Sequence, residues 1–286
     1  MPIVGENIQV KKFAPVGRCI YCGADGGIDG LRSEHIIPLS LGGKAELPEA
    51  SCASCEAITS YIDGYLARGT FYDLRLSVPK LATRRPKERP KTRAAHFEFA
   101  DHEERREFTT GAHPFFTVLP VWGLPGILRD AQPCSEFPPS RALSFTYASP
   151  DLGELLCLEA SETARMKSEI SLNLGTFGRA IAKIAYCNAV ASYGLNGFRA
   201  LVMPDLILGK YPCISHFVGS RIGDPPPPSR RDLLHSVGFR DAVYGRQKLI
   251  VAEVRLFANS GTPEHGMPIY CVVVGAPLGT QNAAAG

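Results

Sequence analysis

The spacing of apolar and polar residues predicts two helices. Between Ala53 and Ala67 the apolar residues Ile58, Ile62 and Leu66 recur every four positions, which places them on one face of a helix. A longer helix is predicted from about Thr176 to Tyr193, with an apolar face and a glycine directly after it as a cap. We expect the apolar face of this second helix to pack in a protein core.

Shorter apolar runs predict strands around these helices. The run Leu31–Pro38 precedes the first helix and follows the glycine-rich turn Gly26–Gly30. Helices and strands that are mixed along the chain favour an α+β fold. The other predicted strands are His96–Phe99, Phe115–Val121, Leu143–Tyr147 and a hairpin of Leu249–Phe257 with Ile269–Val274.

The composition is that of an ordinary globular protein. The chain has 286 residues, of which 45% are hydrophobic and 21% charged, so one or two domains are expected. No uninterrupted apolar stretch approaches 18 residues, which argues against a transmembrane helix. The N-terminal residues Met1–Val10 lack the apolar centre of a signal peptide.

Four of the nine cysteines form two C-x-x-C pairs, Cys19/Cys22 and Cys52/Cys55, about 30 residues apart. Two such turns can point four thiolates at one ion, which gives a closed tetrahedral zinc site of the structural kind. The remaining cysteines are scattered. An odd total without a secretory signal favours a reducing cytoplasm. The expected role of zinc is therefore to fasten the fold.

The residues between the two pairs suggest a reaction. An acid–histidine pair, Glu34-His35, leads into Ile36-Ile37-Pro38, and a Leu-Gly-Gly turn follows at residues 41–43. Together with the cysteine pairs, these features resemble the zinc-containing branch of the HNH endonucleases over about residues 17–66. The resemblance implies a treble-clef-like ββα-metal finger and hydrolysis of DNA phosphodiester bonds with Mg²⁺ or Mn²⁺.

The resemblance also implies roles for single residues. Glu34 would ligate the catalytic divalent cation, and His35 would be the general base that activates water. Glu56 stands directly after the second cysteine pair, where the family has Asn or His, and would be a second ligand; Asp63 is a reserve ligand. Leu47 occupies the slot of the family's middle Asn, so the group that orients His35 must come from elsewhere.

A basic, proline-containing segment follows the finger. Through residue 93 the charge is 14 basic minus 10 acidic residues, or +4, and the remainder gives 17 minus 18, or −1. Prolines in Val78–Arg93 favour an extended strip. We interpret it as a contact for the nucleic-acid backbone, and a solvated linker is the alternative. Its cations are Lys80, Arg84, Arg85, Lys87, Arg89, Lys91 and Arg93.

These observations predict an HNH nuclease finger at residues 1–78, a basic linker at 79–93 and an α+β domain at 94–286 that selects the target or regulates cutting. The expected partner is nucleic acid, specifically double-stranded DNA, and no membrane. One alternative is a zinc-stabilised module that binds nucleic acid or protein and whose catalysis is impaired. Another makes the C-terminal domain the main functional unit.

Overall fold

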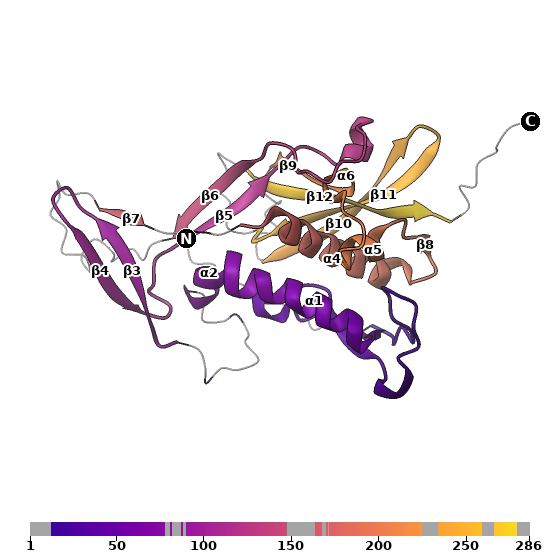
Figure 1. Cartoon of the computed structure of the whole chain (residues 1–286), viewed down its shortest axis with the longest axis horizontal. Helices are drawn as coiled ribbons and strands as arrows, with labels where there is room; N and C mark the ends of the chain where they lie inside the picture. The colour runs from indigo at the N-terminus through magenta and orange to yellow at the C-terminus, as the bar shows by residue number, and fades with distance from the viewer. Residues whose placement is uncertain are drawn as a thin grey trace, which may run out of the picture.

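The computed structural model describes residues 13–77, 81, 87, 90–147, 164–167, 170, 172–224, 234–258 and 266–278. Its N-terminal unit has the predicted ββα order (Figure 1). Strands β1 (Arg32–His35) and β2 (Glu46–Ser51) form an antiparallel pair, and helix α1 (Ala53–Tyr65) follows directly. Short 3₁₀ turns, η1 (Gly27–Asp29) and η2 (Leu39–Leu41), flank β1. The prediction of a ββα finger is therefore confirmed.

Helix α1 ends at Tyr65, two residues before the predicted Ala67, and no glycine ends it. A π-helical turn, η3 (Leu66–Thr70), includes Gly69 and leads into helix α2 (Tyr72–Ser77). Leu66, Leu74 and Leu76 are buried along this path. The packing of these leucines against the core continues the chain in a helical direction beyond the glycine.

A five-stranded antiparallel sheet dominates the C-terminal region. The order β10-β11-β12-β8 forms its main path, and β9 also pairs with β12. Strand β12 is buried along nearly its whole length, which marks it as the centre of the sheet. The strands are β8 (Phe198–Arg199), β9 (Val218–Gly223), β10 (His235–Tyr244), β11 (Gln247–Leu256) and β12 (Met267–Pro277).

Helix α4 (Leu174–Tyr193) lies between this sheet and the finger (Figure 1). It contacts β11 and β12 on one side and α1 on another. The Asn173 side chain caps its first turn by accepting a hydrogen bond from the Thr176 N–H at 2.8 Å. The predicted helix is confirmed, and its central turns are buried on all sides. Two short helices, α5 (Met203–Ile207) and α6 (Ile214–Phe217), follow it.

A smaller, separate sheet projects away from the body (Figure 1). It has the order β4-β3-β7 and its own small core of Ala95, Phe97 and Phe108. A two-stranded sheet, β5 with β6, links it to the body. The bounds are β3 (Thr92–Glu98), β4 (Glu103–Thr109), β5 (Phe115–Val121), η5 (Gly126–Arg129), β6 (Arg141–Tyr147) and β7 (Arg165–Lys167).

The finger shares one hydrophobic core with the C-terminal sheet. This core runs from Cys19 in the finger through α4 to Ala276 at the end of β12. Two polar contacts reinforce it. The Tyr186 hydroxyl donates to the Ile20 carbonyl at 2.7 Å, and His235 Nε2 lies 2.7 Å from the Leu41 carbonyl. The division at residues 78 and 94 stays a prediction, and the shared packing gives the finger a fixed place on α4.

Candidate functional site

The two cysteine pairs converge on a single point. The Sγ atoms of Cys19, Cys22, Cys52 and Cys55 all lie within 4.8 Å of one another, and Cys22 Sγ is 3.6 Å from Cys52 Sγ. Four thiolates around one zinc ion at a Zn–S distance of about 2.3 Å would be roughly 3.8 Å apart. The cluster therefore fits a structural zinc ion, as the spacing of the cysteines predicted.

Local structure explains how each pair is held. The first pair is closed by a turn in which the Gly23 N–H donates to the Cys19 carbonyl at 2.9 Å, with Gly23 at φ +78°. The second pair lies at the start of α1. There the Ser54 hydroxyl, 3.3 Å from Cys52 Sγ, lowers the pKa of the Cys52 thiol to about 6. Burial raises the pKa of Cys55. A bound zinc ion would supply the charge that keeps all four sulfurs deprotonated.

The side chains of Glu34 and His35 on β1 point in different directions. Glu34 points into the protein and is 4% exposed, whereas the neighbouring His35 side chain is 20% exposed. Successive residues of a strand face opposite sides, so the two side chains lie in separate environments. The structure therefore keeps Glu34 and His35 apart, although they are adjacent in sequence.

The neighbour of His35 across the strand pair is Glu46. The two residues are directly opposite in the β1–β2 register, and Glu46 Oε2 lies 3.8 Å from His35 Nδ1. Leu47, in the slot of the family's Asn, faces Glu34 across the same strand pair and is buried. A bulge between Arg32 and Glu34 sets this register. The sequence does not identify Glu46 as the neighbour of His35, because this contact depends on the register of the strand pair.

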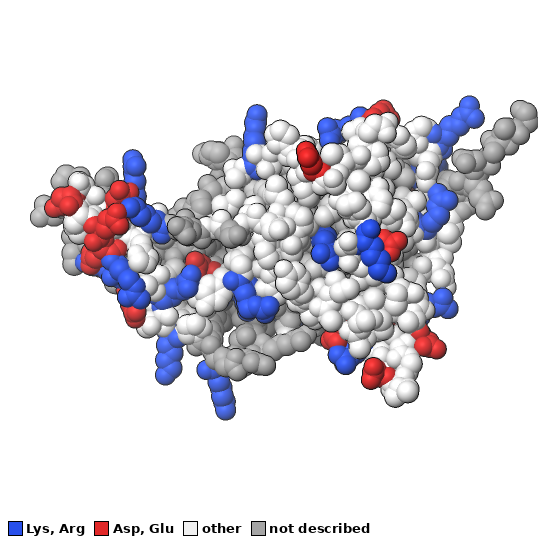
Figure 2. All heavy atoms as spheres, in the orientation of Figure 1, with Lys and Arg blue, Asp and Glu red and all other residues white. Residues whose placement is uncertain are grey.

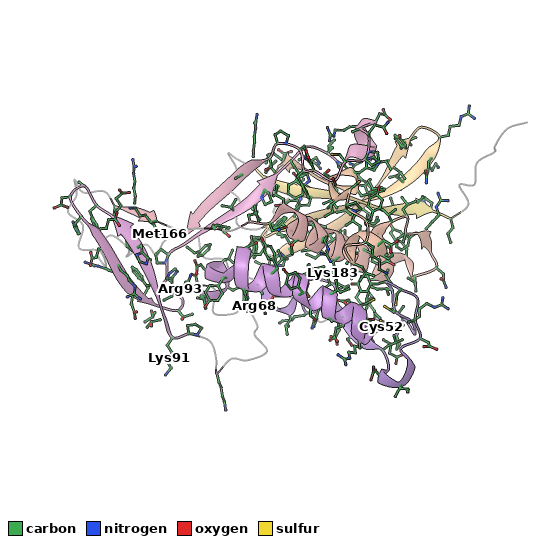
Figure 3. The ribbon with its side chains drawn as sticks, in the orientation of Figure 1. Cys52, Arg68, Lys91, Arg93, Met166 and Lys183 are labelled. Carbon is green, nitrogen blue, oxygen red and sulfur yellow. The ribbon has the colours of Figure 1, made fainter. Side chains whose placement is uncertain are left out.

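Glu34 lies in a buried cluster with Asp63 of α1 and Lys183 of α4. Lys183 Nζ is 2.8 Å from Glu34 Oε1, 2.8 and 2.9 Å from the two oxygens of Asp63, and 3.1 Å from the His35 carbonyl. The Thr59 hydroxyl donates to the other oxygen of Glu34 at 3.0 Å. Figure 3 shows Lys183 on α4 where that helix faces α1. The structure thus joins Glu34 to the reserve ligand Asp63 through a lysine.

Lys183 is charged in this cluster although it is completely buried. Burial alone would lower the pKa of Lys183, but the carboxylates of Asp63 and Glu34 outweigh it and raise the pKa above its ordinary value. The three N–H groups of the ammonium meet three acceptors, namely both carboxylates and the His35 carbonyl. A buried charge is stable under these conditions, because it is both paired and hydrogen-bonded.

The acid pair does not fit a divalent cation in this arrangement. Every carboxylate oxygen of Glu34 and Asp63 already contacts Lys183 or Thr59. A hard cation needs several free oxygen ligands at about 2.0–2.6 Å. The position between the two carboxylates is taken by the ammonium.

Glu56 is directed elsewhere. Its carboxylate forms an ion pair with Arg32. The side chains of Arg32 and Glu56 are 52% and 26% exposed, so this pair lies at the surface. In the other cluster Lys183 and Glu34 are buried, and Asp63, at 23% exposed, lies at its outer edge. The structure therefore groups Glu34 with Asp63 and pairs Glu56 with Arg32. The role of Glu56 as a metal ligand stays a prediction.

Comparison with known protein families identifies the N-terminal unit. Residues 19–68 match the model of the HNH endonuclease family. These residues form an HNH endonuclease domain. Searches of curated proteins and of solved structures found no significant match. The matched range covers both cysteine pairs, β1, β2 and α1, so the resemblance read from the motifs is confirmed.

The basic strip after the HNH domain is only partly described. Lys80, Arg84, Arg85 and Arg89 lie outside the described residues. Lys87 and Lys91 are exposed. Arg93 forms an ion pair with Asp73 at 2.5 Å and lies 4.7 Å above the Tyr72 ring. The observed role of Arg93 is thus to join β3 to α2, and the binding of nucleic acid by the strip stays a prediction.

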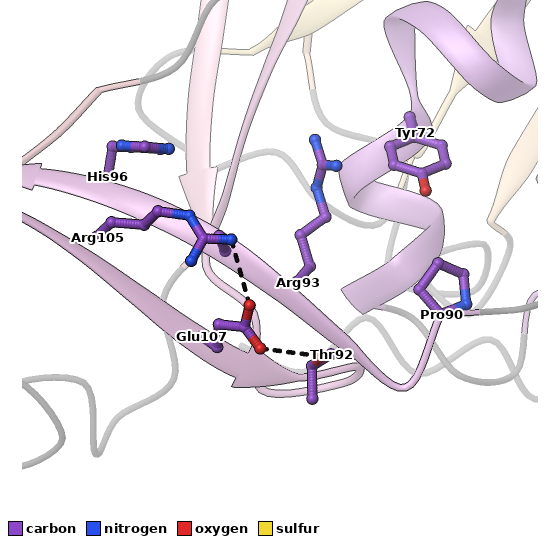
Figure 4. Close-up of a pocket in the computed structure, with 8 residues that line it drawn as sticks. Tyr72, Pro90, Thr92, Arg93, His96, Arg105 and Glu107 are labelled. Carbon is purple, nitrogen blue, oxygen red and sulfur yellow. Dashed lines mark hydrogen bonds and ion pairs between the residues drawn. The ribbon is translucent and has the colours of Figure 1, made fainter.

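A shallow pocket of about 420 Å³ opens beside Arg93 (Figure 4). Arg105 and Thr92 both contact Glu107 there, at 3.2 Å each. Figure 2 shows positive and negative side chains interspersed on this projecting sheet. The mixture of charge gives no continuous basic surface on the visible face of the sheet.

Among the described residues, no helix is both long enough and apolar enough to cross a membrane. Helix α4, with 20 residues, is long enough, but Arg179, Lys183 and several polar residues interrupt its apolar sequence. That lysine between Ala182 and Ile184 was the available signal for the buried cluster. A single charged residue inside an apolar helical stretch indicates a partner of opposite charge in the core.

Proposed function

We propose that this chain is an endonuclease that hydrolyses phosphodiester bonds of DNA, with His35 as the general base. The observation that carries the proposal is the position of His35 within the HNH domain. It lies on β1, partly exposed, with a carboxylate of Glu46 on one side of its ring. A neutral imidazole can accept a proton from water, and a nearby carboxylate stabilises the imidazolium that forms.

In this reaction His35 takes a proton from a water molecule whose oxygen attacks the phosphorus atom. The bond from phosphorus to the leaving oxygen breaks, and the leaving oxygen keeps the electron pair and takes up a proton from solvent. The Glu46 carboxylate on the neighbouring strand, 3.8 Å from His35 Nδ1, is too far for a hydrogen bond and acts by stabilising the positive charge of the imidazolium. The zinc cluster holds β1, β2 and α1 in place and takes no part in the chemistry. The exposed Lys87 and Lys91 support contact with a phosphate backbone, which would give affinity without sequence preference.

The dependence on Mg²⁺ or Mn²⁺ stays a prediction to be tested. Glu34 and Glu56 were expected to be the ligands, and each is paired with a basic side chain of this protein. No step above is therefore assigned to a divalent cation. This pairing is also the observation that favours the second candidate, a zinc-stabilised module that binds nucleic acid or protein without cutting it.

The test is cleavage of supercoiled plasmid by the zinc-loaded full chain in Mg²⁺, in Mn²⁺ and in the absence of both. We expect nicked or linear product from the wild type. His35→Ala, purified in parallel, should be slower by roughly 10²- to 10⁴-fold, the usual contribution of a general base. Equal zinc content and equal far-ultraviolet circular dichroism would show that the variant is folded.

Two results would contradict the proposal. If the wild type retards plasmid in a gel but cuts it under none of the three conditions, the binding module is the better description. If His35→Ala cuts as fast as the wild type, the hydrolysis comes from another residue or from a contaminating nuclease.

A further inference from the structure

Three segments distant in sequence meet at a single buried positive charge. Glu34 comes from β1, Asp63 from α1 and Lys183 from the middle of α4. Lys183 has no exposed surface, and the Glu34 side chain is 5% exposed. Long ionic side chains are almost never buried in this way unless they are paired, so the cluster is a specific feature of the fold.

Glu34 and Asp63 can both stay ionised only if a cation lies beside them. The buried carboxylate of Glu34 and the partly exposed carboxylate of Asp63 repel each other, and without a positive charge one of them would take up a proton. Lys183 meets this need with three short contacts and leaves a local charge of −1, from two carboxylates and one ammonium. A divalent cation added beside it would bring the local charge to +1 and face a fixed ammonium.

The geometry points to Lys183 as the resident cation of this HNH domain: its ammonium permanently occupies the place between Glu34 and Asp63, so that this acid pair takes no divalent metal ion. The inference rests on the proposed function in one respect only: the excluded ion is the divalent cation that the proposed nuclease was expected to use. It concerns a property of the site that can be measured whether or not DNA is cut.

Lys183 also contacts the main chain of His35. Its ammonium donates to the carbonyl of His35 at 3.1 Å, while its partner Glu34 precedes His35 on the same strand. Helix α4 is packed between the sheet and α1, so the ammonium has little freedom to move. Lys183 therefore holds β1 from inside, while the His35 side chain lies on the other face of the strand.

The experiment is a titration of zinc-loaded full-length protein with Mn²⁺, followed by electron paramagnetic resonance of the free ion. We expect the wild type and Asp63→Asn to bind equal amounts of Mn²⁺, because Asp63 does not ligate the ion in the wild type. Lys183→Met, which keeps an unbranched chain and removes the charge, should gain one Mn²⁺ per chain. Its melting temperature should then rise with Mn²⁺ concentration, whereas that of the wild type should not.

The matched control is the double variant Lys183→Met with Glu34→Gln. It has the same local charge of −1 as the wild type but only one carboxylate, so it should fold and lose the new Mn²⁺ site. A purely structural lysine would predict no gain of metal in Lys183→Met. Zinc measured before and after each titration confirms that Mn²⁺ has not entered the cysteine site.

Two results would overturn the inference. The first is a Mn²⁺ site in the wild type that Asp63→Asn abolishes, and the second is a folded Lys183→Met that gains no Mn²⁺. If Lys183→Met does not fold, the comparison of the wild type with Asp63→Asn decides the question alone. Absence of plasmid cleavage would contradict the proposed nuclease and would leave these binding results unaffected.

Discussion

At the scale of single residues, the buried ion cluster makes a charge-removing substitution far more harmful than its size suggests. Removal of one partner leaves the others without compensation in a region of low polarity. Such losses typically cost about 3–5 kcal/mol, whereas replacement of both partners by neutral groups is often tolerated. The two kinds of change can be compared directly at Glu34 and Lys183.

We predict that Lys183→Met lowers the free energy of unfolding by about 3–5 kcal/mol in buffer that contains zinc but no Mg²⁺ or Mn²⁺. Addition of Glu34→Gln should restore part of this loss, because only one buried carboxylate then remains. Urea unfolding of the single and double variants at constant zinc concentration measures both effects. A single variant as stable as the wild type would show that the ion cluster contributes little.

The pair of His35 and Glu46 gives a second prediction at this scale. Glu46→Gln removes the negative charge 3.8 Å from His35 Nδ1 and keeps the shape of the side chain. Since a half-exposed ion pair is worth about 1 kcal/mol at most, kcat should fall roughly two- to fivefold. Glu49→Gln, an exposed change on the same strand, is the control and should leave kcat unchanged. Equal rates in both variants would remove Glu46 from the mechanism.

At the scale of elements, the zinc site determines whether β1, β2 and α1 keep their arrangement. We predict that Cys52→Ser loses bound zinc and unfolds at a lower urea concentration, because structural zinc binding is part of the folding free energy. Cys134→Ser changes an exposed cysteine outside the cluster and should keep both properties. Zinc analysis with urea unfolding makes the comparison, and equal zinc content in both variants would contradict the assignment.

Sequence patterns predicted the elements that have strong local signals. The predicted strand Phe115–Val121 has the same bounds as β5, and α4 begins only two residues before the predicted Thr176. Strand β10 was missed because none of its residues is fully buried, so its apolar alternation is weak. Its identity as a strand comes from its ladder with β11. A pairing of this kind is a tertiary property.

The candidate site was predictable as far as it is local. Cysteine spacing was enough for the zinc cluster, and the cysteine pairs together with the Glu34–Pro38 run and the Leu-Gly-Gly turn were enough for the family. The partner of Glu34 could not be inferred from the motif, because Lys183 lies 120 residues beyond Asp63 and reaches it only through helix packing. Likewise, the register that puts Glu46 beside His35 depends on a bulge that the sequence does not mark.

At the scale of the whole molecule, His235 links the HNH domain to the C-terminal sheet and is sensitive to pH. Its Nε2 donates to the Leu41 carbonyl, and its Nδ1 accepts from the Phe257 N–H at 3.2 Å, so the ring is neutral with the proton on Nε2. Burial lowers the pKa of His235 to about 4. A second proton would have to displace the Phe257 N–H.

We predict that stability falls between about pH 6.5 and pH 4. In this range the unfolded chain binds a proton at His235 and the folded chain does not, so unfolding is favoured as pH decreases. The loss should reach roughly 3 kcal/mol near pH 4 and vanish above pH 6.5. Urea unfolding of His235→Gln, which can still donate to Leu41, should show a weaker dependence. An identical pH dependence in both proteins would exclude His235 as a cause.

The single core that joins the HNH domain to α4 also sets an order of events during synthesis. Asp63 leaves the ribosome 120 residues before Lys183, a delay of about 6–24 s at usual rates of translation. During that interval Glu34 and Asp63 have no ammonium, and the apolar side of α1 has no helix α4 to cover it. The nascent finger therefore cannot reach its final state while it emerges, and its packing against α4 is completed only late in translation.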